Sequence, residues 1–168
     1  MISKKIEDAL NEQINAEMWS AYLYLSMSLH FEHEGRSGIA NWFNIQFQEE
    51  QAHALALMSF LNARNGKVML KPIAEVPTSW DSPKAAFEAT LEHEINVTKL
   101  IHNLYALAED EKDFATRQKL NTFVAEQVEE EENVRQIIDD LTLVGNDGTG
   151  LLQIDRELAA RTYVAPQL

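Results

Sequence analysis

Residues 43–61 read FNIQFQEEQAHALALMSFL, and the spacing of the apolar residues in this stretch decides the fold. They recur at steps of three and four, which is typical of an amphipathic helix rather than of a strand. The buried stripe of that helix is predicted to run through Phe43, Phe47, Glu50, His53, Leu57 and Leu61. Its middle therefore holds a carboxylate and an imidazole at positions where apolar core residues are expected.

The same periodicity extends over most of the 168 residues. It predicts an all-α fold, with helices at about 4–34, 37–65, 82–110 and 113–144 and a short amphipathic helix at about 150–162. Glycine and proline gather between these segments. Gly66 is typical of a helix end, and the pair Ser82-Pro83 is typical of a helix start.

Connection lengths predict how these helices are arranged. The first two helices are joined by only a few residues, as are the third and fourth, so each pair is expected to form an antiparallel hairpin. The link at 67–81 contains Pro72 and Pro77 and is expected to be extended. At ~3.3 Å per residue it spans ~50 Å, more than the ~44 Å of the preceding helix. We therefore expect a four-helix bundle with one long crossover.

Polar residues interrupt the apolar stripes at matching places in the two hairpins. Each hairpin has one glutamate on its first helix and, 33 and 36 positions later, a pair on its second helix. These residues are Glu17, Glu50 and His53 in the first hairpin and Glu94, Gln127 and Glu130 in the second. Their distances from the turns agree within about one helical turn, so all six are predicted to meet at mid-bundle.

Four converging glutamates need compensation, because an unpaired buried carboxylate costs on the order of several kcal/mol. No Lys or Arg occupies the four stripes at that level. One alternative is that the acids are protonated or lie on the surface. For a single glutamate this alternative is favoured, but not for four matched positions with a histidine. Two divalent cations would balance four carboxylates, and oxygen-rich ligation with one imidazole suits Fe or Mn better than tetrahedral Zn.

The pattern corresponds to the known dinuclear carboxylate site of ferritin-like bundles, although Gln127-x-x-Glu130 stands where that site has Glu-x-x-His. Over essentially its whole length the sequence resembles the bacterial non-haem ferritins, in helix plan, crossover, fifth helix and ligand spacing. The resemblance implies a single ferritin-like domain over 1–168. It also implies iron storage in a shell of 24 subunits, with ferroxidase activity that uses O2 or H2O2 and deposits ferric oxyhydroxide.

The resemblance further implies which residues hold iron. One iron of the ferroxidase centre is expected on Glu17, Glu50 and His53, and the other on Glu94 and Glu130, with Glu50 as the bridge. Gln127 takes the place of a weak ligand, so we expect the second iron to bind more weakly and to leave more readily. A third iron site would use Glu49, Glu126, Glu129 and the shared Glu130. The alternative for these last acids is a solvated face, since 129–132 is a run of glutamates.

Other residues near the predicted centre allow further expectations. Tyr24 lies two helical turns after Glu17; the resemblance implies an oxidisable tyrosine, whereas a core tyrosine with a satisfied hydroxyl is nearly as well supported. Gln51 replaces the methionine that binds haem in bacterioferritins, so no haem is expected. Arg117 and Leu120 stand where animal ferritins have channel acids, which leaves the iron entry route open. The remaining histidines are expected on the surface or in packing: His30, His33, His93 and His102.

Composition narrows the function classes. The chain has 14 Lys and Arg against 27 Asp and Glu, a formal net charge of −13, which disfavours binding to nucleic acid or to an anionic membrane. Cysteine is absent, which excludes disulfides, thiol catalysis and Fe–S clusters. No stretch approaches the length of a transmembrane helix, so a cytoplasmic location is expected. Trp19 and Tyr22 are candidates for exposed side chains at a contact between copies of the chain.

Two rival functions remain open on the sequence. A rubrerythrin-like or oxidase-type enzyme would use the same bundle to reduce peroxide or oxygen without storing iron. The lack of cysteine argues against a rubredoxin-type partner domain, and the fifth helix favours a storage shell. The other rival is a metal-free acidic bundle that acts as an interaction module, in which the core glutamates could be replaced without loss of stability.

Overall fold

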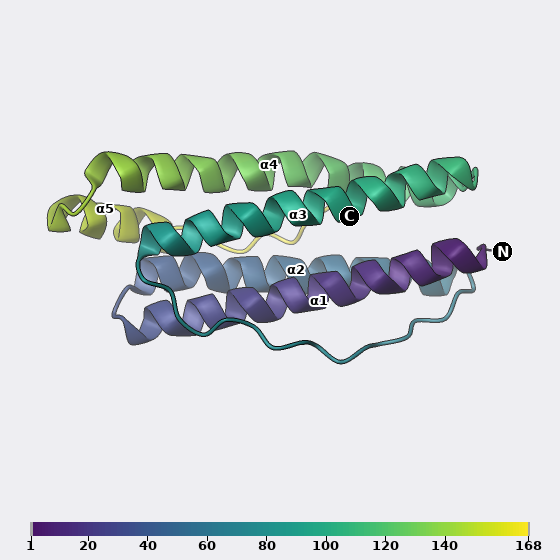
Figure 1. Ribbon diagram of the computed structural model, residues 1–168, viewed down its shortest axis with the longest axis horizontal. Helices are drawn as coiled ribbons and strands as arrows, with labels where there is room; N and C mark the ends of the chain where they lie inside the picture. The colour runs from purple at the N-terminus through teal and green to yellow at the C-terminus, as the bar shows by residue number, and fades with distance from the viewer. Residues whose placement is uncertain (1, 168) are drawn as a thin grey trace.

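The computed structural model describes residues 2–167, which form five helices and no strands. The helices are α1 (Lys4–His33), α2 (Ser37–Ala63), α3 (Pro83–Asp110), α4 (Phe114–Val144) and α5 (Gly148–Ala159). The hairpins α1–α2 and α3–α4 pack into a bundle, and α5 lies against α2 at one end (Figure 1). Residues 67–81 run along α1 from one end of the bundle to the other (Figure 1). The predicted all-α bundle with one long crossover and a short fifth helix is confirmed.

Capping side chains explain where most helices begin. Four helices start after a side chain that accepts a hydrogen bond from the backbone N–H three residues later: Ser3, Ser82, Asp113 and Asp147. The cap at Asp147 starts α5 at Gly148, two residues before the expected position. At the other end of a helix, α2 stops at Ala63 rather than at residue 65, because Asn65 adopts a left-handed conformation with φ of 60°.

The N-terminus of α2 has no cap of its own, and α5 supplies one. Oδ1 of Asp155 accepts a hydrogen bond of 2.9 Å from the backbone N–H of Ile39, in the first turn of α2. The two helices meet closely at Gly38, where an added Cβ would lie 1.6 Å from the carbonyl oxygen of Asp155. Only glycine permits this approach, so the contact between α2 and α5 requires a glycine at position 38 in the first turn of α2.

A reciprocal contact ends α5. Nδ2 of Asn41 on α2 donates hydrogen bonds to the carbonyl oxygens of Leu158, at 3.1 Å, and Arg161, at 3.0 Å. The carbonyl of Arg161 is thereby held by a side chain outside the helix. The helix ends at Ala159, three residues earlier than the expected 162, and Asn41 satisfies carbonyl groups at this end.

The interior is divided into two apolar clusters by a polar band. In every long helix, the members of one cluster precede the band and the members of the other follow it. The α5 end is filled by residues such as Met27, Phe31, Phe43, Phe87 and Val134, and the opposite end by Leu10, Leu57, Ile101, Leu120 and Phe123. Each fully buried side chain of this kind stabilises the fold by about 1.5–3 kcal/mol. The band between the clusters contains the predicted ligands.

The outer faces of the helices are mainly polar, with scattered apolar side chains. Tyr22 is exposed as expected, with 48% of its surface accessible. Trp19 is only partly exposed, which corrects the prediction, because its ring packs against His93 with centroids 5.3 Å apart. Among the helices in residues 2–167, none combines the length and the apolar character needed to cross a membrane.

We expect Asp155→Ala to loosen α5 by about 1 kcal/mol, the usual cost of a lost N-cap. Hydrogen exchange of the α5 amides and of the Ile39 N–H should accelerate accordingly. Asp155→Asn keeps an oxygen acceptor at the same place and serves as the matched control. Equal exchange rates in wild type and Asp155→Ala would show that the contact does not hold α5.

Candidate metal centre

The polar band brings the predicted ligands from four helices to one level. Glu17 from α1, Glu50 and His53 from α2, Glu94 from α3 and Gln127 from α4 are all at most 5% exposed. Glu130 from α4 is partly buried and faces a pocket on the side of the bundle. Because each stripe is apolar on both sides of these positions, the packing of the two clusters forces their side chains inward.

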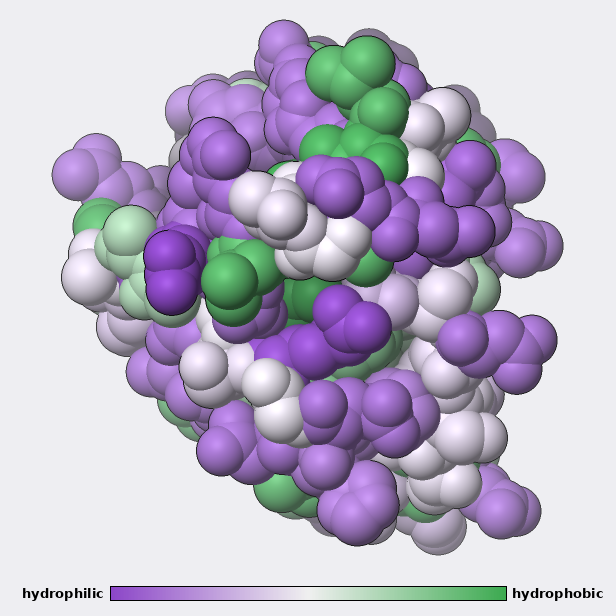
Figure 2. Space-filling view, turned by 90° about the vertical axis from the view of Figure 1, so that its left-hand side faces the viewer, coloured by the Kyte–Doolittle hydropathy of each residue, from purple (hydrophilic) through white to green (hydrophobic). Residues whose placement is uncertain are grey.

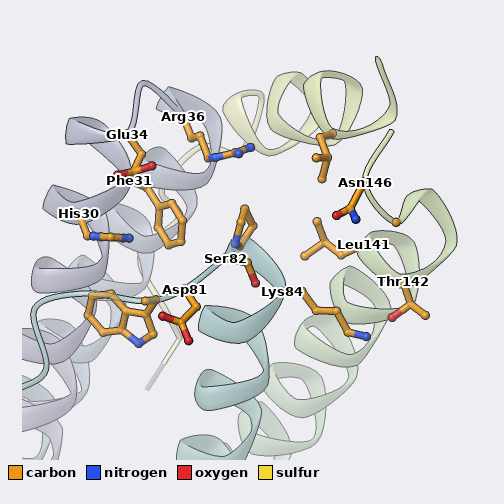
Figure 3. A pocket seen from close by; sticks show the side chains of 14 residues that line it. His30, Phe31, Glu34, Arg36, Asp81, Ser82, Lys84, Leu141, Thr142 and Asn146 are labelled. Atoms are coloured by element: carbon orange, nitrogen blue, oxygen red, sulfur yellow. The ribbon is translucent and has the colours of Figure 1, made fainter. Parts of the chain in front are cut away.

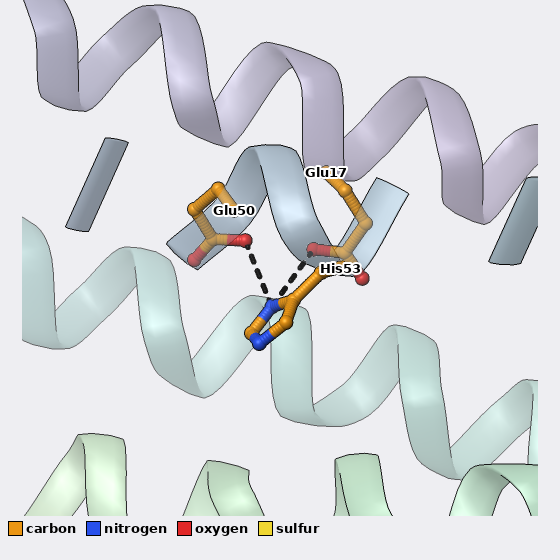
Figure 4. Close-up of side chains that lie close together, drawn as sticks. All are labelled: Glu17, Glu50 and His53. Atoms are coloured by element: carbon orange, nitrogen blue, oxygen red, sulfur yellow. Dashed lines mark hydrogen bonds and ion pairs between the residues drawn. The ribbon is translucent and has the colours of Figure 1, made fainter. Parts of the chain in front are cut away.

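Three of these residues form a compact group. Glu17, Glu50 and His53 each offer a ligand atom, and the three atoms lie within 4.8 Å of one another (Figure 4). Nδ1 of His53 is 3.3 Å from Oε2 of Glu50 and 4.0 Å from Oε2 of Glu17. Within residues 2–167 this is the one group of three or more His, Asp or Glu side chains with that geometry. It is the half of the predicted centre that the fold assembles most closely.

One oxygen in this group lacks a hydrogen bond. Oε1 of Glu17 accepts from Nε2 of Gln13 at 2.8 Å, whereas Oε2 is buried and accepts no hydrogen bond from any described residue. Buried carboxylate oxygens normally accept a hydrogen bond. An oxygen such as Oε2 of Glu17, which lacks a donor and lies near two other ligand atoms, fits a site for a cation. The donor set of two carboxylates and one imidazole suits iron or manganese.

The second half of the centre is held differently. Oε1 of Glu94 accepts a hydrogen bond from the hydroxyl of Tyr24, and Oε2 accepts one from Nε2 of Gln127 at 3.1 Å. Oε2 of Glu130 accepts from Nε2 of Gln46 at 2.9 Å. The carboxyl groups of both glutamates therefore accept hydrogen bonds from uncharged donors. Nε2 of Gln127 also lies 3.2 Å from Oγ1 of Thr98. This half is closed by hydrogen bonds, unlike the group around His53.

Sequence reasoning missed the two glutamines that support the acids. Gln13 and Gln46 are buried and each contacts a predicted ligand. A signal was present, because each of them lies four positions before a stripe glutamate, Glu17 or Glu50, on the same helix face. Only the fold shows that Gln46 reaches across to Glu130 rather than to its own helix neighbour.

Burial decides the protonation of the acids. Loss of water raises the pKa of Glu17 well above its usual value, and the nearby Glu50 raises it further. Burial likewise raises the pKa of Glu50. For Glu94, burial and the neighbouring Glu130 raise the pKa to about 7. Without a metal ion, protons on these carboxyl groups thus reduce the energetic cost of burying them.

His53 carries a proton that a metal ion must replace. Burial lowers the pKa of His53, but the contacts with Glu126 and Glu50 outweigh it and hold the pKa well above the usual value. Nε2 of His53 lies 3.0 Å from Oε2 of Glu126, an ion pair whose direction does not satisfy hydrogen-bond geometry. The imidazolium therefore balances the surrounding carboxylates. Binding of a cation at Nδ1 requires its deprotonation.

The remaining predicted acids gather in one pocket of about 300 Å³ on the side of the bundle. Its lining includes Glu49 from α2 and Glu126, Glu129 and Glu130 from α4. His53 also lines this pocket, so a single imidazole separates it from the buried group of ligands. The acids of the expected third site are therefore neighbours in space. The C-terminal residues 164–167 close the pocket on another side.

Tyr24 and His93 lie beside the centre. The Tyr24 hydroxyl is fully buried, and burial and Glu94 raise its pKa well above the usual value, so it stays a donor. His93 packs between Trp19 and Tyr24, and Oγ of Ser20 lies 2.8 Å from its Nε2. Burial lowers the pKa of His93 to about 4, which keeps it neutral. This histidine is a packing residue, as expected.

A different pocket, of about 320 Å³, lies at the end of the bundle between α1, α3, α4 and the start of α5 (Figure 3). Figure 2 views the molecule from that end, where hydrophilic side chains surround a hollow with apolar groups. The lining mixes charges of both signs, among them Arg36, Lys84, Glu34 and Asp81. Its side chains include no converging set of metal ligands among the described residues. The converging ligand atoms lie at mid-bundle instead.

The protonation of Glu94 predicts how stability depends on pH. Its pKa is about 7 in the folded apoprotein against 4.5 when exposed. The folded state thus binds more protons, so its stability is full below about pH 4.5 and falls as pH rises to about 7, by about 3 kcal/mol per chain.

We expect Glu94→Gln to remove this part of the pH dependence. Relative to wild type, the variant should gain more in melting temperature at about pH 7.5 than at about pH 5. Calorimetry of the metal-free protein measures both. Glu92→Gln, on the same helix but exposed, is the control. An unchanged pH slope in Glu94→Gln would contradict the assignment.

Comparisons with known proteins agree with this architecture. The model of the ferritin-like domain family matches residues 7–144. A bacterial non-haem ferritin of Bacteroides fragilis strain 638R is 47% identical over 161 residues, covering 96% of this chain and 100% of that protein. A bacterial non-haem ferritin of Staphylococcus epidermidis is 37% identical over 163 residues, covering 97% and 98% of the two chains.

Solved structures extend the similarity to three dimensions. An open-pore ferritin of the hyperthermophilic archaeon Archaeoglobus fulgidus matches with a TM-score of 0.95 and 51% identity, over 96% of this chain and 100% of that chain. A form of the Archaeoglobus fulgidus ferritin engineered to be closed matches with a TM-score of 0.96 and 50% identity, over 98% and 100%. On the bundle, the family model and relatives of matching length, the chain belongs to the ferritin family.

Proposed function

We propose that the protein is the subunit of an iron-storage ferritin, which oxidises Fe(II) at the mid-bundle centre and stores it as ferric oxyhydroxide. The observation that carries this proposal is the buried group of Glu17, Glu50 and His53, with its unsatisfied carboxylate oxygen. Family membership supports it, because a ferritin fold gives such a group an established chemical use. The relatives are named non-haem ferritins, which agrees with the expectation of no haem at Gln51.

In this proposal iron is the substrate, and the chain supplies two unequal positions for it. The first uses Glu17, Glu50 and His53, and the second uses Glu94 and Glu130, with Glu50 between them. Gln127 offers an amide where a charged ligand would bind more firmly. The second position therefore has no imidazole and gains no charge from Gln127, and both Glu94 and Glu130 must give up hydrogen bonds from neutral donors before they bind iron.

The residues of the chain do three things in the reaction. The carboxylates neutralise the charge of two Fe(II) ions and bring them together, and the apolar clusters exclude water on either side of the band. His53 releases its proton when iron binds. Each Fe(II) loses one electron. Two Fe(II) ions therefore reduce one O2, with two protons, to H2O2, or one H2O2, with two protons, to two water molecules. Tyr24 fixes the orientation of Glu94 through its hydroxyl.

Fe(III) then leaves through the acidic pocket. Glu126 contacts His53 on one side and shares the pocket with Glu49, Glu129 and Glu130 on the other, which offers carboxylates in succession for a third iron. This path leads from the buried group to the side of the bundle. We further propose that the described chain forms one domain, that it assembles into a shell of 24 copies around the mineral, and that the shell is cytoplasmic.

The inequality of the two positions predicts stepwise binding. Anaerobic Fe(II) titration of the apoprotein should show a tight step lost in His53→Ala and a weaker step lost in Glu130→Ala. Gln127→Glu should strengthen the weaker step roughly tenfold, the scale on which groups around a metal change affinity. Equal losses of both steps in the two alanine variants would contradict the assignment.

Storage itself is tested by adding aerobic Fe(II) far beyond two equivalents per chain and measuring particle size and retained iron. We expect a large soluble particle that turns amber and keeps the excess iron. Saturation at two irons per chain would instead support a rubrerythrin-like or oxidase-type enzyme. Oxidation no faster than in protein-free buffer would support a metal-free interaction module.

A further inference from the structure

The C-terminal tail, residues 160–167, returns from α5 toward the acidic pocket. In Figure 1 it is the yellow chain that leaves α5 and runs back along the bundle. Its start is fixed by Asn41, which binds the carbonyl oxygens of Leu158 and Arg161. Residues 164–167 then line the pocket that holds the acids near His53. The tail is therefore placed where iron would leave the centre.

Arg161 is the charged residue of this tail, and it points into the pocket wall. One guanidinium nitrogen lies 2.7 Å from Oε2 of Glu49, and the other lies 3.5 Å from the carbonyl oxygen of Trp42. The guanidinium carbon is 4.9 Å from the centre of the Trp42 ring. The side chains of Arg161 and Glu49 are only 25% and 16% exposed, so water screens the pair weakly. Such a charge-assisted contact is stronger than an ordinary surface ion pair.

The charges around this contact are unbalanced. Four acids line the pocket, Glu49, Glu126, Glu129 and Glu130, and the two cationic groups that line it are Arg161 and His53. Since His53 already pairs with Glu126 and Glu50, Arg161 is the cation left for Glu49. Burial raises the pKa of Glu49, and Arg161 acts against that rise. Arg161 thus occupies the place at which a metal cation would interact with this acid.

We propose that Arg161 is a positioning residue for iron transfer, a tethered counter-cation that holds Glu49 and that a metal cation must displace to bind in the acidic pocket. This inference rests on the proposed function, because it concerns the third of the three iron positions. A cation of higher charge replaces the guanidinium, and the guanidinium returns when that cation moves on. The tether at Asn41 keeps Arg161 close at hand throughout. Arg161 consequently weakens the pocket as a binding site and favours passage over retention.

The test is a calorimetric titration of the full-length assembled apoprotein with Zn²⁺, a redox-inert probe, at about neutral pH. In wild type we expect the tight step and the weaker step of the mid-bundle centre and, after them, a third and weakest step from the pocket. Arg161→Gln should strengthen this pocket step about tenfold, the scale of one charge-assisted contact. The tight step should stay within about twofold, since Arg161 touches none of Glu17, Glu50 and His53.

Three variants separate charge from structure. Arg161→Lys keeps the cation and should stay within about threefold of wild type, whereas a gain equal to that of Arg161→Gln would overturn the proposal. Arg156→Gln makes the same change of charge at an exposed position on α5 and should leave every step unchanged. In a double variant with Glu49→Gln, the gain from Arg161→Gln should vanish, because the acid that it frees is gone.

The outcomes distinguish this inference from the proposed function. A tight step that is present together with an unaltered pocket step in Arg161→Gln would overturn the role of Arg161 alone. Absence of the tight step from every protein, wild type included, would overturn the mid-bundle centre and the role of Arg161 with it. A gain that persists in the double variant would place the displaced contact elsewhere and would also overturn the proposal.

Discussion

Burial of several carboxylates at one level of a helical bundle is the constraint on which the rest of the structure depends. Each unpaired buried charge costs on the order of several kcal/mol. The apolar clusters on either side of the band offset this cost, since residues such as Phe43 and Leu57 are completely buried. The two clusters also fix the helices so firmly that the acids cannot turn outward. A bundle selected only for stability would fill the band with apolar residues.

In the apoprotein, protons and side-chain amides stabilise the buried acids that metal ions would otherwise stabilise. His53 is an imidazolium between three carboxylates, Glu94 holds its proton up to about pH 7, and two glutamines donate to the remaining acids. In the proposed function, metal binding is therefore an exchange of cations for protons at fixed positions rather than the creation of a new site. Little backbone movement is needed for that exchange, because the ligand atoms already converge.

The centre is unequal because its two halves are satisfied by different partners. Around His53, an orphaned oxygen and a displaceable proton leave room for a cation. Around Glu94, a tyrosine and a glutamine already use both carboxylate oxygens. Toward the side of the bundle, Glu126 and then Glu49 continue the series of acids, and Arg161 neutralises the last of them. Under the proposed function, affinity for iron thus decreases outward, which suits a site that passes its substrate on.

The sequence by itself determined the helices and the crossover, because helix period, caps and link length are local properties. It also determined the level of the ligands, because the spacing of Glu17, Glu50 and His53 does not depend on where the helices end. It could not determine the roles of Gln46, Trp19 or Arg161. Gln46 reaches a different helix, Trp19 packs against His93, and Arg161 reaches Glu49 through a tail whose direction depends on Asn41 and Gly38. Such contacts join residues far apart in the chain, and only packing decides which side chains meet.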